Sequence, residues 1–138
     1  MALIIDTSVL IAAERGRFDL DGFLTQAGDV AVAISAVTAS ELLHGVDRAH
    51  TARAHSARSQ FVDDILDAFP VIPFGLAEAR VHSRLWAQLT KSGKTIGAHD
   101  LFVAATAVSL GSSVATLNRK EFTRVPGLAL EPMESWGR

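Results

Sequence analysis

The sequence contains no cysteine among its 138 residues. This absence excludes disulfides, thiolate-bound zinc and cysteine nucleophiles, and it is typical of proteins of a reducing cytoplasm. An excess of positive charge is also missing, because 13 Lys and Arg stand against 15 Asp and Glu and the formal net charge is −2. Sequence-independent binding of nucleic acid through an overall basic surface is therefore disfavoured, although a bound metal and a few local cations can still attract phosphate.

Long hydrophobic runs are absent as well. The most apolar helix candidate, residues 102–110, is far too short to span a bilayer. Residues 1–6 have no basic segment and end in a carboxylate, so we expect no signal peptide, no membrane span and a cytoplasmic protein. Hydrophobic residues make up 49% of the chain and charged residues 20%. This composition favours one soluble globular domain over residues 1–138.

Short apolar runs alternate with amphipathic segments along the chain. Strands are predicted at 3–5, 30–34, 70–73, 113–116 and 128–130, and helices at 9–14, 18–26, 36–46, 51–69, 76–89 and 98–110. Strands that are separated by helices pair in parallel, with helices on both faces of the sheet. We therefore predict a single α/β domain with a central, mostly parallel β-sheet flanked by helices on both faces. Functional groups in such sheets gather beyond the carboxyl ends of the strands.

Four side chains with oxygen atoms fall at that edge of the sheet: Asp6, Glu41, Asp100 and Asn118. Asp6 ends the first strand, Asn118 follows a later strand, and the other two lie early in helices. Three carboxylates beside buried surface repel one another and lose hydration unless a cation or protons neutralise them. Carboxylate and amide oxygens are the ligands that Mg²⁺ prefers. The sequence therefore predicts a Mg²⁺ site formed by these four residues, with Mn²⁺ as a substitute.

Each of the four residues also has a purely structural interpretation. Asp6 could cap the helix that follows it, and Glu41 could form a capping box with Thr38. The negative charge of Asp100 could simply stabilise the positive end of its helix dipole, and Asn118 could be a turn residue. These interpretations are reasonable for each residue alone. The joint position of all four at one edge favours the metal site.

Other polar residues carry weaker signals. The histidines at positions 44, 82 and 99 do not have a zinc-binding spacing, so zinc is disfavoured. The tripeptide Gly93-Lys94-Thr95 lacks the first glycine of a phosphate-binding loop and is interpreted as a loop that ends a helix. Five basic residues are expected to border the site, either as contacts for RNA phosphates or as ordinary solvated surface: Lys91, Lys94, Arg119, Lys120 and Arg124.

Four segments, in order, resemble the motifs of the PIN-domain family. They are Asp6-Thr7-Ser8-Val9-Leu10, Ser35-x-x-Thr38-x-x-Glu41-Leu42-x-x-Gly45, His99-Asp100-x-x-Val103-Ala104-Ala105-x-Ala107, and Thr116-x-Asn118-x-x-x-Phe122 followed by Val125-Pro126-Gly127-Leu128. Their order and spacing span nearly the whole chain and are similar to those of bacterial VapC-type toxins.

The resemblance implies a Mg²⁺-dependent endoribonuclease toxin that cleaves structured RNA, commonly tRNA or ribosomal RNA, and is held inactive by a cognate antitoxin. By motif match, Asp6, Glu41 and Asp100 would be the acidic metal-site residues. Asn118 would fill the fourth position, where many members have aspartate. The supporting hydroxyl groups would be those of Thr7, Ser8 and Thr116. The resemblance also implies a homodimer that forms a heterotetramer or a larger assembly with its antitoxin.

Two apolar segments, residues 18–24 and 61–69, are candidates for either the core or a surface that binds these partners. We interpret both as parts of the core. If part of the 61–69 stripe is exposed, it is a natural antitoxin groove or dimer face.

The expected chemistry follows from the acids. A divalent cation activates water for attack on phosphate and screens the charge that develops there, and Glu41 is the candidate to hold or deprotonate that water. A haloacid-dehalogenase-like transfer through Asp6 is disfavoured because that scheme requires an aspartate at position 8, where this chain has Ser8. The alternative from another class is a catalytically inactive PIN-like module that binds RNA or a partner. The intact acid set argues against it.

Overall fold

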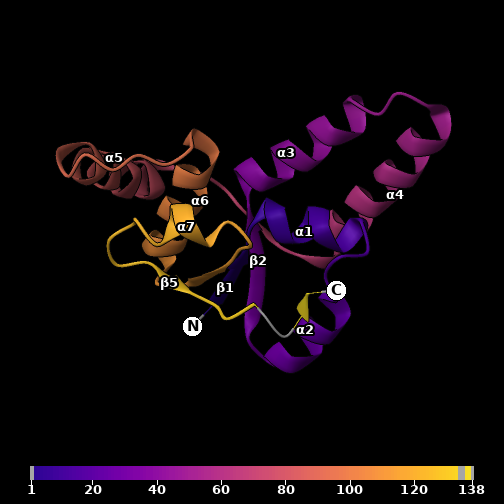
Figure 1. Ribbon diagram of the computed structural model, residues 1–138, viewed down its shortest axis with the longest axis horizontal. Coiled ribbons are helices and arrows are strands. Elements are labelled where there is room, and N and C mark those ends of the chain that lie inside the picture. The colour runs from indigo at the N-terminus through magenta and orange to yellow at the C-terminus, as the bar shows by residue number, and fades with distance from the viewer. Residues whose placement is uncertain (1, 134–135, 138) are drawn as a thin grey trace.

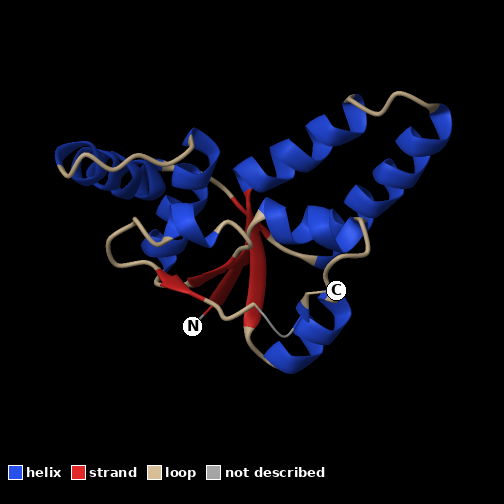
Figure 2. Cartoon of the chain, viewed as in Figure 1, coloured by secondary structure: helices blue, strands red, loops and turns tan. Residues whose placement is uncertain are grey.

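Strands and helices alternate along the chain in the computed structural model, which describes residues 2–133 and 136–137 (Figures 1 and 2). The elements are β1 (Ala2–Ile5), α1 (Thr7–Glu14), α2 (Leu20–Ala27), β2 (Ala31–Ser35), α3 (Ala36–Asp47), α4 (Ala52–Ala68), β3 (Val71–Ile72), α5 (Leu76–Lys91), α6 (Ala98–Leu110), β4 (Ser113–Ala115), α7 (Arg119–Phe122) and β5 (Ala129–Leu130). Each element predicted from the sequence is present. Helix α7 is the one element among these that is not predicted from the sequence.

The five strands form one sheet in the order β3-β2-β1-β4-β5, and every pairing between neighbours is parallel. The chain starts at the central strand β1, moves outward through β2 and β3, and then returns to the other side of β1 for β4 and β5. Such a reversal opens a crevice at the carboxyl ends of the two strands on either side of it. The predicted α/β architecture is confirmed, and the crevice lies between β1 and β4.

Alternate residues of β1 face two separate cores. Leu3 and Ile5 pack against α1, α2 and α4, whereas Ile4 packs against α5 and α6. Successive side chains of a strand point to opposite faces, so an unbroken apolar run is what a sheet covered on both sides requires. Figure 1 shows α5, α6 and α7 on one side of the sheet and α1 and α4 on the other. The predicted helices on both faces are therefore confirmed.

The two apolar segments interpreted as core are largely buried. Phe18 and Phe23 have 2% and 4% of their surface exposed, and Val62, Ile65 and Phe69 of the second segment are also buried. The exposed large apolar side chains lie elsewhere. They include Leu76 and Trp86 on α5, with 69% and 61% of their surface exposed. Across the residues that the structure describes, no helix has the length and apolar character needed to cross a membrane.

Local caps fix the boundaries of α3, α5 and α6. The Ser35 side chain accepts a 3.2 Å hydrogen bond from the Thr38 amide and caps α3. Gly111 ends α6 in the left-handed conformation at φ 64°, which glycine adopts without steric cost. Gly93, at φ 71°, follows the last turn of α5. The interpretation of Gly93-Lys94-Thr95 as a loop that ends a helix is confirmed.

Candidate active site

Asp6 lies at the carboxyl end of β1, beside the crevice between β1 and β4. Its side chain is 3% exposed, and its Oδ2 accepts hydrogen bonds from Ser8 Oγ (2.7 Å) and Thr116 Oγ1 (2.8 Å). Asp6 stands at the N-cap position of α1, yet its carboxylate makes no capping hydrogen bond. The interpretation of Asp6 as a helix cap is therefore wrong. Its carboxylate is instead held by two hydroxyls, one from Ser8 in the first turn of α1 and one from Thr116 just after β4.

Glu41 projects from α3 toward the same edge of the sheet. Its Oε1 accepts a 2.7 Å hydrogen bond from Thr7 Oγ1, and its Oε2 lies 3.1 Å from His99 Nδ1. The cap of α3 is Ser35, and the Glu41 side chain does not reach back to it. The interpretation of Glu41 as part of a capping box with Thr38 is therefore wrong. Thr7 thus links the end of β1 to α3.

Asp100 lies half-buried in the first turn of α6. Burial raises its pKa to about 6, with further contributions from the negative charges of Asp6, Glu121 and Glu41, in that order. The Asn118 amide donates a 2.8 Å hydrogen bond to Asp100 Oδ2 and partly opposes this rise. The structure therefore brings the three predicted carboxylates into one electrostatic site.

Asn118 also lies at this site. It occupies the N-cap position of α7 without a capping hydrogen bond from its side chain, and its backbone N–H donates to Thr116 Oγ1 at 2.9 Å. Its side-chain N–H, rather than its carbonyl oxygen, faces Asp100. The expected position beside the acids is confirmed. The amide must rotate if its oxygen is to bind a cation.

The sequence reading missed Glu121, whose charge raises the pKa of Asp100. Glu121 lies in α7, three residues after Asn118, and its Oε2 accepts a 3.1 Å hydrogen bond from the Gly97 amide at the start of α6. The spacing Asn118-x-x-Glu121 was the available signal, because residues three apart share a helix face. It was overlooked because residues 119–122 were not predicted to be helical.

The basic residues predicted to border the site divide into two groups. Arg119 donates a 2.8 Å hydrogen bond to the Glu131 carbonyl, and Arg124 donates a 2.6 Å hydrogen bond to the Thr95 carbonyl. These two guanidinium groups stabilise loops. Solvent-exposed positions are occupied by Lys91, Lys94 and Lys120. A contact between these lysines and RNA stays a prediction.

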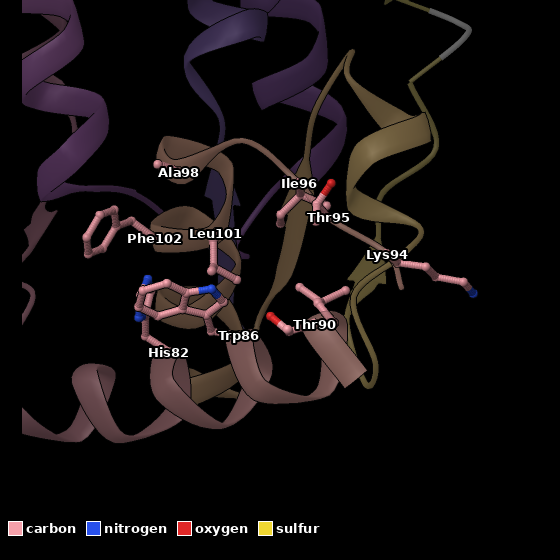
Figure 3. Close-up of a pocket in the computed structure, with 10 residues that line it drawn as sticks. His82, Trp86, Thr90, Lys94, Thr95, Ile96, Ala98, Leu101 and Phe102 are labelled. Atoms are coloured by element: carbon pink, nitrogen blue, oxygen red, sulfur yellow. The ribbon is translucent and has the colours of Figure 1, made fainter. Parts of the chain in front are cut away.

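An apolar hollow lies between α5 and α6, and no acidic side chain lines it (Figure 3). It encloses about 300 Å³, and its lining includes His82, Trp86 and Phe102. The His82 and Phe102 rings stack with centroids 4.6 Å apart, and burial lowers the pKa of His82. Lys94 is the one lining residue with a permanent charge. This hollow lacks the groups for phosphate chemistry and is not the candidate active site.

The acids fit a hard divalent cation in their donor chemistry. Three carboxylates gather around Asp100, and no ion pair found among the described residues joins Asp6 or Asp100 to a lysine or arginine. A cation would supply the missing positive charge. Within residues 2–133 and 136–137, no group of three or more His, Asp or Glu side chains is close enough to hold a metal ion as it stands. Three of the acids would therefore have to rotate their side chains to contact one cation directly.

The sheet order and the acid-lined crevice between β1 and β4 define an α/β protein of PIN type. A model of the PIN domain matches residues 3–128. The chain is 38% identical to ribonuclease VapC1 of Rickettsia felis, with 98% of each chain covered. A solved structure of VapBC2 from Rickettsia felis, bound to a DNA fragment from their promoter, superimposes with a TM-score of 0.86 at 26% identity and covers 95% of this chain and 98% of that one.

A second solved structure has higher sequence identity. It is VapBC-5 of Mycobacterium tuberculosis, described as a member of the VapBC family of toxin–antitoxin systems, with a TM-score of 0.75, 31% identity and coverage of 95% and 97% of the two chains. The chain belongs to the PIN-domain family and, within it, to the VapC ribonucleases.

Proposed function

We propose that the protein is an endoribonuclease toxin that requires Mg²⁺ and cleaves RNA at the edge of the sheet formed by Asp6, Glu41 and Asp100. One observation carries the proposal. The pKa of Asp100 is raised to about 6 by burial and by three neighbouring carboxylates, and among the described residues no lysine or arginine pairs with Asp6 or Asp100. Such an arrangement costs stability and is typical of a functional site. Its similarity to ribonuclease VapC1 of Rickettsia felis supports RNA as the substrate.

The residues of the site would have separate roles in orienting the acids and in activating water. Ser8 and Thr116 fix the orientation of the Asp6 carboxylate, because both hydroxyls donate to the same oxygen. Thr7 fixes one oxygen of Glu41 and leaves the other on the side of His99. Glu41 is therefore oriented to hold or deprotonate the water that attacks the phosphodiester.

Asp6, Asp100 and Glu41 would hold the cation, and Asn118 would join them if its amide rotates. A bound divalent cation supplies positive charge for the phosphate and lowers the pKa of water. Asn118 meanwhile opposes the rise in the pKa of Asp100, because a hydrogen bond from an N–H group favours the charged form of a carboxylate. Mn²⁺ has similar oxygen preferences and is expected to substitute.

The partners follow from the same comparisons. The VapBC-5 structure belongs to a toxin–antitoxin family, and we propose that a cognate antitoxin inhibits this chain as well. The finer proposals are a structured RNA substrate such as tRNA or ribosomal RNA, a homodimer, and a heterotetramer or larger assembly with the antitoxin. They rest on the motif resemblance.

The decisive experiment is cleavage of total cellular RNA by the purified chain, with Mg²⁺ and with chelator. We expect defined fragments that appear with Mg²⁺ and disappear with chelator, and a loss of cleavage of at least a hundredfold in Asp6→Asn, Glu41→Gln and Asp100→Asn. Sequencing the new 5′ ends identifies the RNA. Glu78→Gln, a change of an acid on α5, is the matched control and should cleave normally. Cleavage that survives both chelator and the three substitutions would contradict the proposal.

The alternative is an inactive PIN-like module that binds RNA or a partner. Expression in bacteria distinguishes the two functions. A toxin that acts by cleavage arrests growth, and Asp6→Ala, Glu41→Ala and Asp100→Ala each relieve the arrest while the protein stays folded. Growth arrest by the folded triple variant would show that the protein acts by binding.

A further inference from the structure

Helix α3 carries a row of polar side chains that begins at Glu41. Glu41 and His44 of α3 and its C-cap residue Arg48, which keeps a helical backbone conformation, are three and four residues apart and therefore share one face of the helix. Together with Ser40 and with His99 at the start of α6, they line one hollow of about 320 Å³, the α3 cleft. The candidate catalytic residue Glu41 thus lies at one end of the α3 cleft and Arg48 at the other.

The length of the α3 cleft separates two binding positions. Arg48 is seven positions after Glu41, which corresponds to a rise of about 10 Å along the helix. The α3 cleft is thus long enough for Arg48 to bind a neighbouring part of the substrate while Glu41 faces the cleaved phosphate.

Arg48 is available to bind such a group. In the part of the chain that the structure describes, its guanidinium makes no hydrogen bond and no ion pair. By contrast, Arg58 donates to the Gly45 carbonyl and pairs with Glu14. Arg48 is exposed, and an unpaired guanidinium carries five N–H donors in a planar fork that matches a phosphate.

The surroundings of Arg48 add positive charge. A smaller hollow between α1, α3 and α4 is lined by Arg48 together with Arg15 and Arg58. Glu14 and Glu41 also line it, and Glu14 is paired with Arg58, so three arginines stand against two acids. The α3 cleft thus runs from a negative end at the acids to a positive end at Arg48. A polyanion bound along it would place one phosphate at the acids, where a divalent cation is needed, and the next at a guanidinium.

We propose that the α3 cleft binds the RNA backbone beside the cleaved bond and that Arg48 binds the phosphate next to the scissile one. The proposal rests on the ribonuclease function proposed above. It assigns Arg48 a role in substrate binding and none in the chemical step. An acidic protein segment is the other anion that could meet Arg48, but continuity of the cleft with Glu41 and His99 favours the substrate.

The test measures RNA binding and RNA cleavage separately. In chelator, fluorescence anisotropy with a labelled RNA gives the dissociation constant at several salt concentrations. In Mg²⁺, the same RNA gives kcat and KM. The variants are Arg48→Gln, Arg48→Lys and the control Arg84→Gln, which removes an exposed arginine of α5.

Arg48→Gln should weaken binding about tenfold and raise KM with little change in kcat. It should also make the slope of log affinity against log salt less steep by roughly 0.7 to 0.9, the amount expected for one lost phosphate contact. Arg48→Lys should keep the wild-type slope, and Arg84→Gln should match the wild type. An Arg48→Gln variant that is indistinguishable from Arg84→Gln overturns the proposal, even if it has lost affinity for an acidic peptide. A wild-type chain that neither binds nor cleaves RNA overturns the ribonuclease function itself.

Discussion

The Asn118 side-chain amide donates a 2.8 Å hydrogen bond to Asp100 Oδ2, across 18 residues of sequence. Asn118 follows β4 and Asp100 opens α6, so this bond joins the end of a strand to the start of a buried helix. It also limits the rise in the pKa of Asp100 that burial and the neighbouring acids cause. The neutral residue at the fourth motif position is thus a donor to the acids in the metal-free chain.

Replacing Asn118 with aspartate exchanges this donor for a like charge. We expect Asn118→Asp to lower the melting temperature in chelator at pH 7.5 by several degrees, because two carboxylates would then face each other. Added Mg²⁺ should raise the melting temperature more steeply than in the wild type, since the site gains negative charge. Asn118→Ala is the control for loss of the hydrogen bond alone. An Asn118→Asp chain with an unchanged melt and an unchanged Mg²⁺ titration would contradict the position of Asn118 beside the cation.

The raised pKa of Asp100 predicts a pH dependence of stability. In the folded chain the pKa of Asp100 is about 6, above its ordinary value of 3.8. Between these values the folded chain keeps a proton that the unfolded chain releases, so the free energy of unfolding should fall as the pH rises. After allowance for the half-exposed position, the loss is roughly 1 kcal/mol.

The matched variant is Asp100→Asn, which cannot ionise. In chelator it should melt about 3 °C above the wild type at pH 7.5 and together with it near pH 4. Thermal melts of both chains at half-unit pH steps would check this. Parallel curves over the whole range would show that Asp100 does not titrate near 6.

Metal binding should be visible without any substrate. A cation that binds only the folded chain stabilises it by mass action. Millimolar Mg²⁺ or Mn²⁺ should raise the melting temperature of the wild type by a few degrees and should leave Asp6→Asn almost unchanged. Glu78→Gln should respond like the wild type. The absence of any shift in the wild type with both cations would count against the metal site.

The exposed apolar surface of α5 provides a test of the homodimer. Trp86 is 61% exposed beside the hollow of Figure 3, and burial of such a side chain in an interface is favourable. Light scattering should give a mass near twice 14.7 kDa for the wild type and a lower mass for Trp86→Glu. Gln88→Glu adds the same charge to an exposed position of α5 and should stay dimeric. A monomeric wild type at micromolar concentration would contradict the homodimer.

The amino-acid sequence by itself determined the order of the elements and the edge at which the acids lie. The apolar run that ends at Asp6 predicts a buried strand, and the helix that opens at Asp100 is too apolar to face water. These signals are local, because the hydrophobic effect imposes the period of each element on its own segment. The short helix Arg119–Phe122 escaped prediction, since a four-residue segment has no periodicity to read.

Only the tertiary structure decided which side chains meet. The contacts Thr7–Glu41, Thr116–Asp6 and Asn118–Asp100 join residues 34, 110 and 18 positions apart. They depend on the placement of β4 directly beside β1, on the packing of α3 and α6 over the sheet, and on the rotamers that this packing allows. The same packing brought Glu121 to Asp100 and left the Arg48 guanidinium without a hydrogen bond or ion pair to any residue that the structure describes. The hydrophobic periodicity of the sequence does not encode such pairings, because they arise between elements rather than within them.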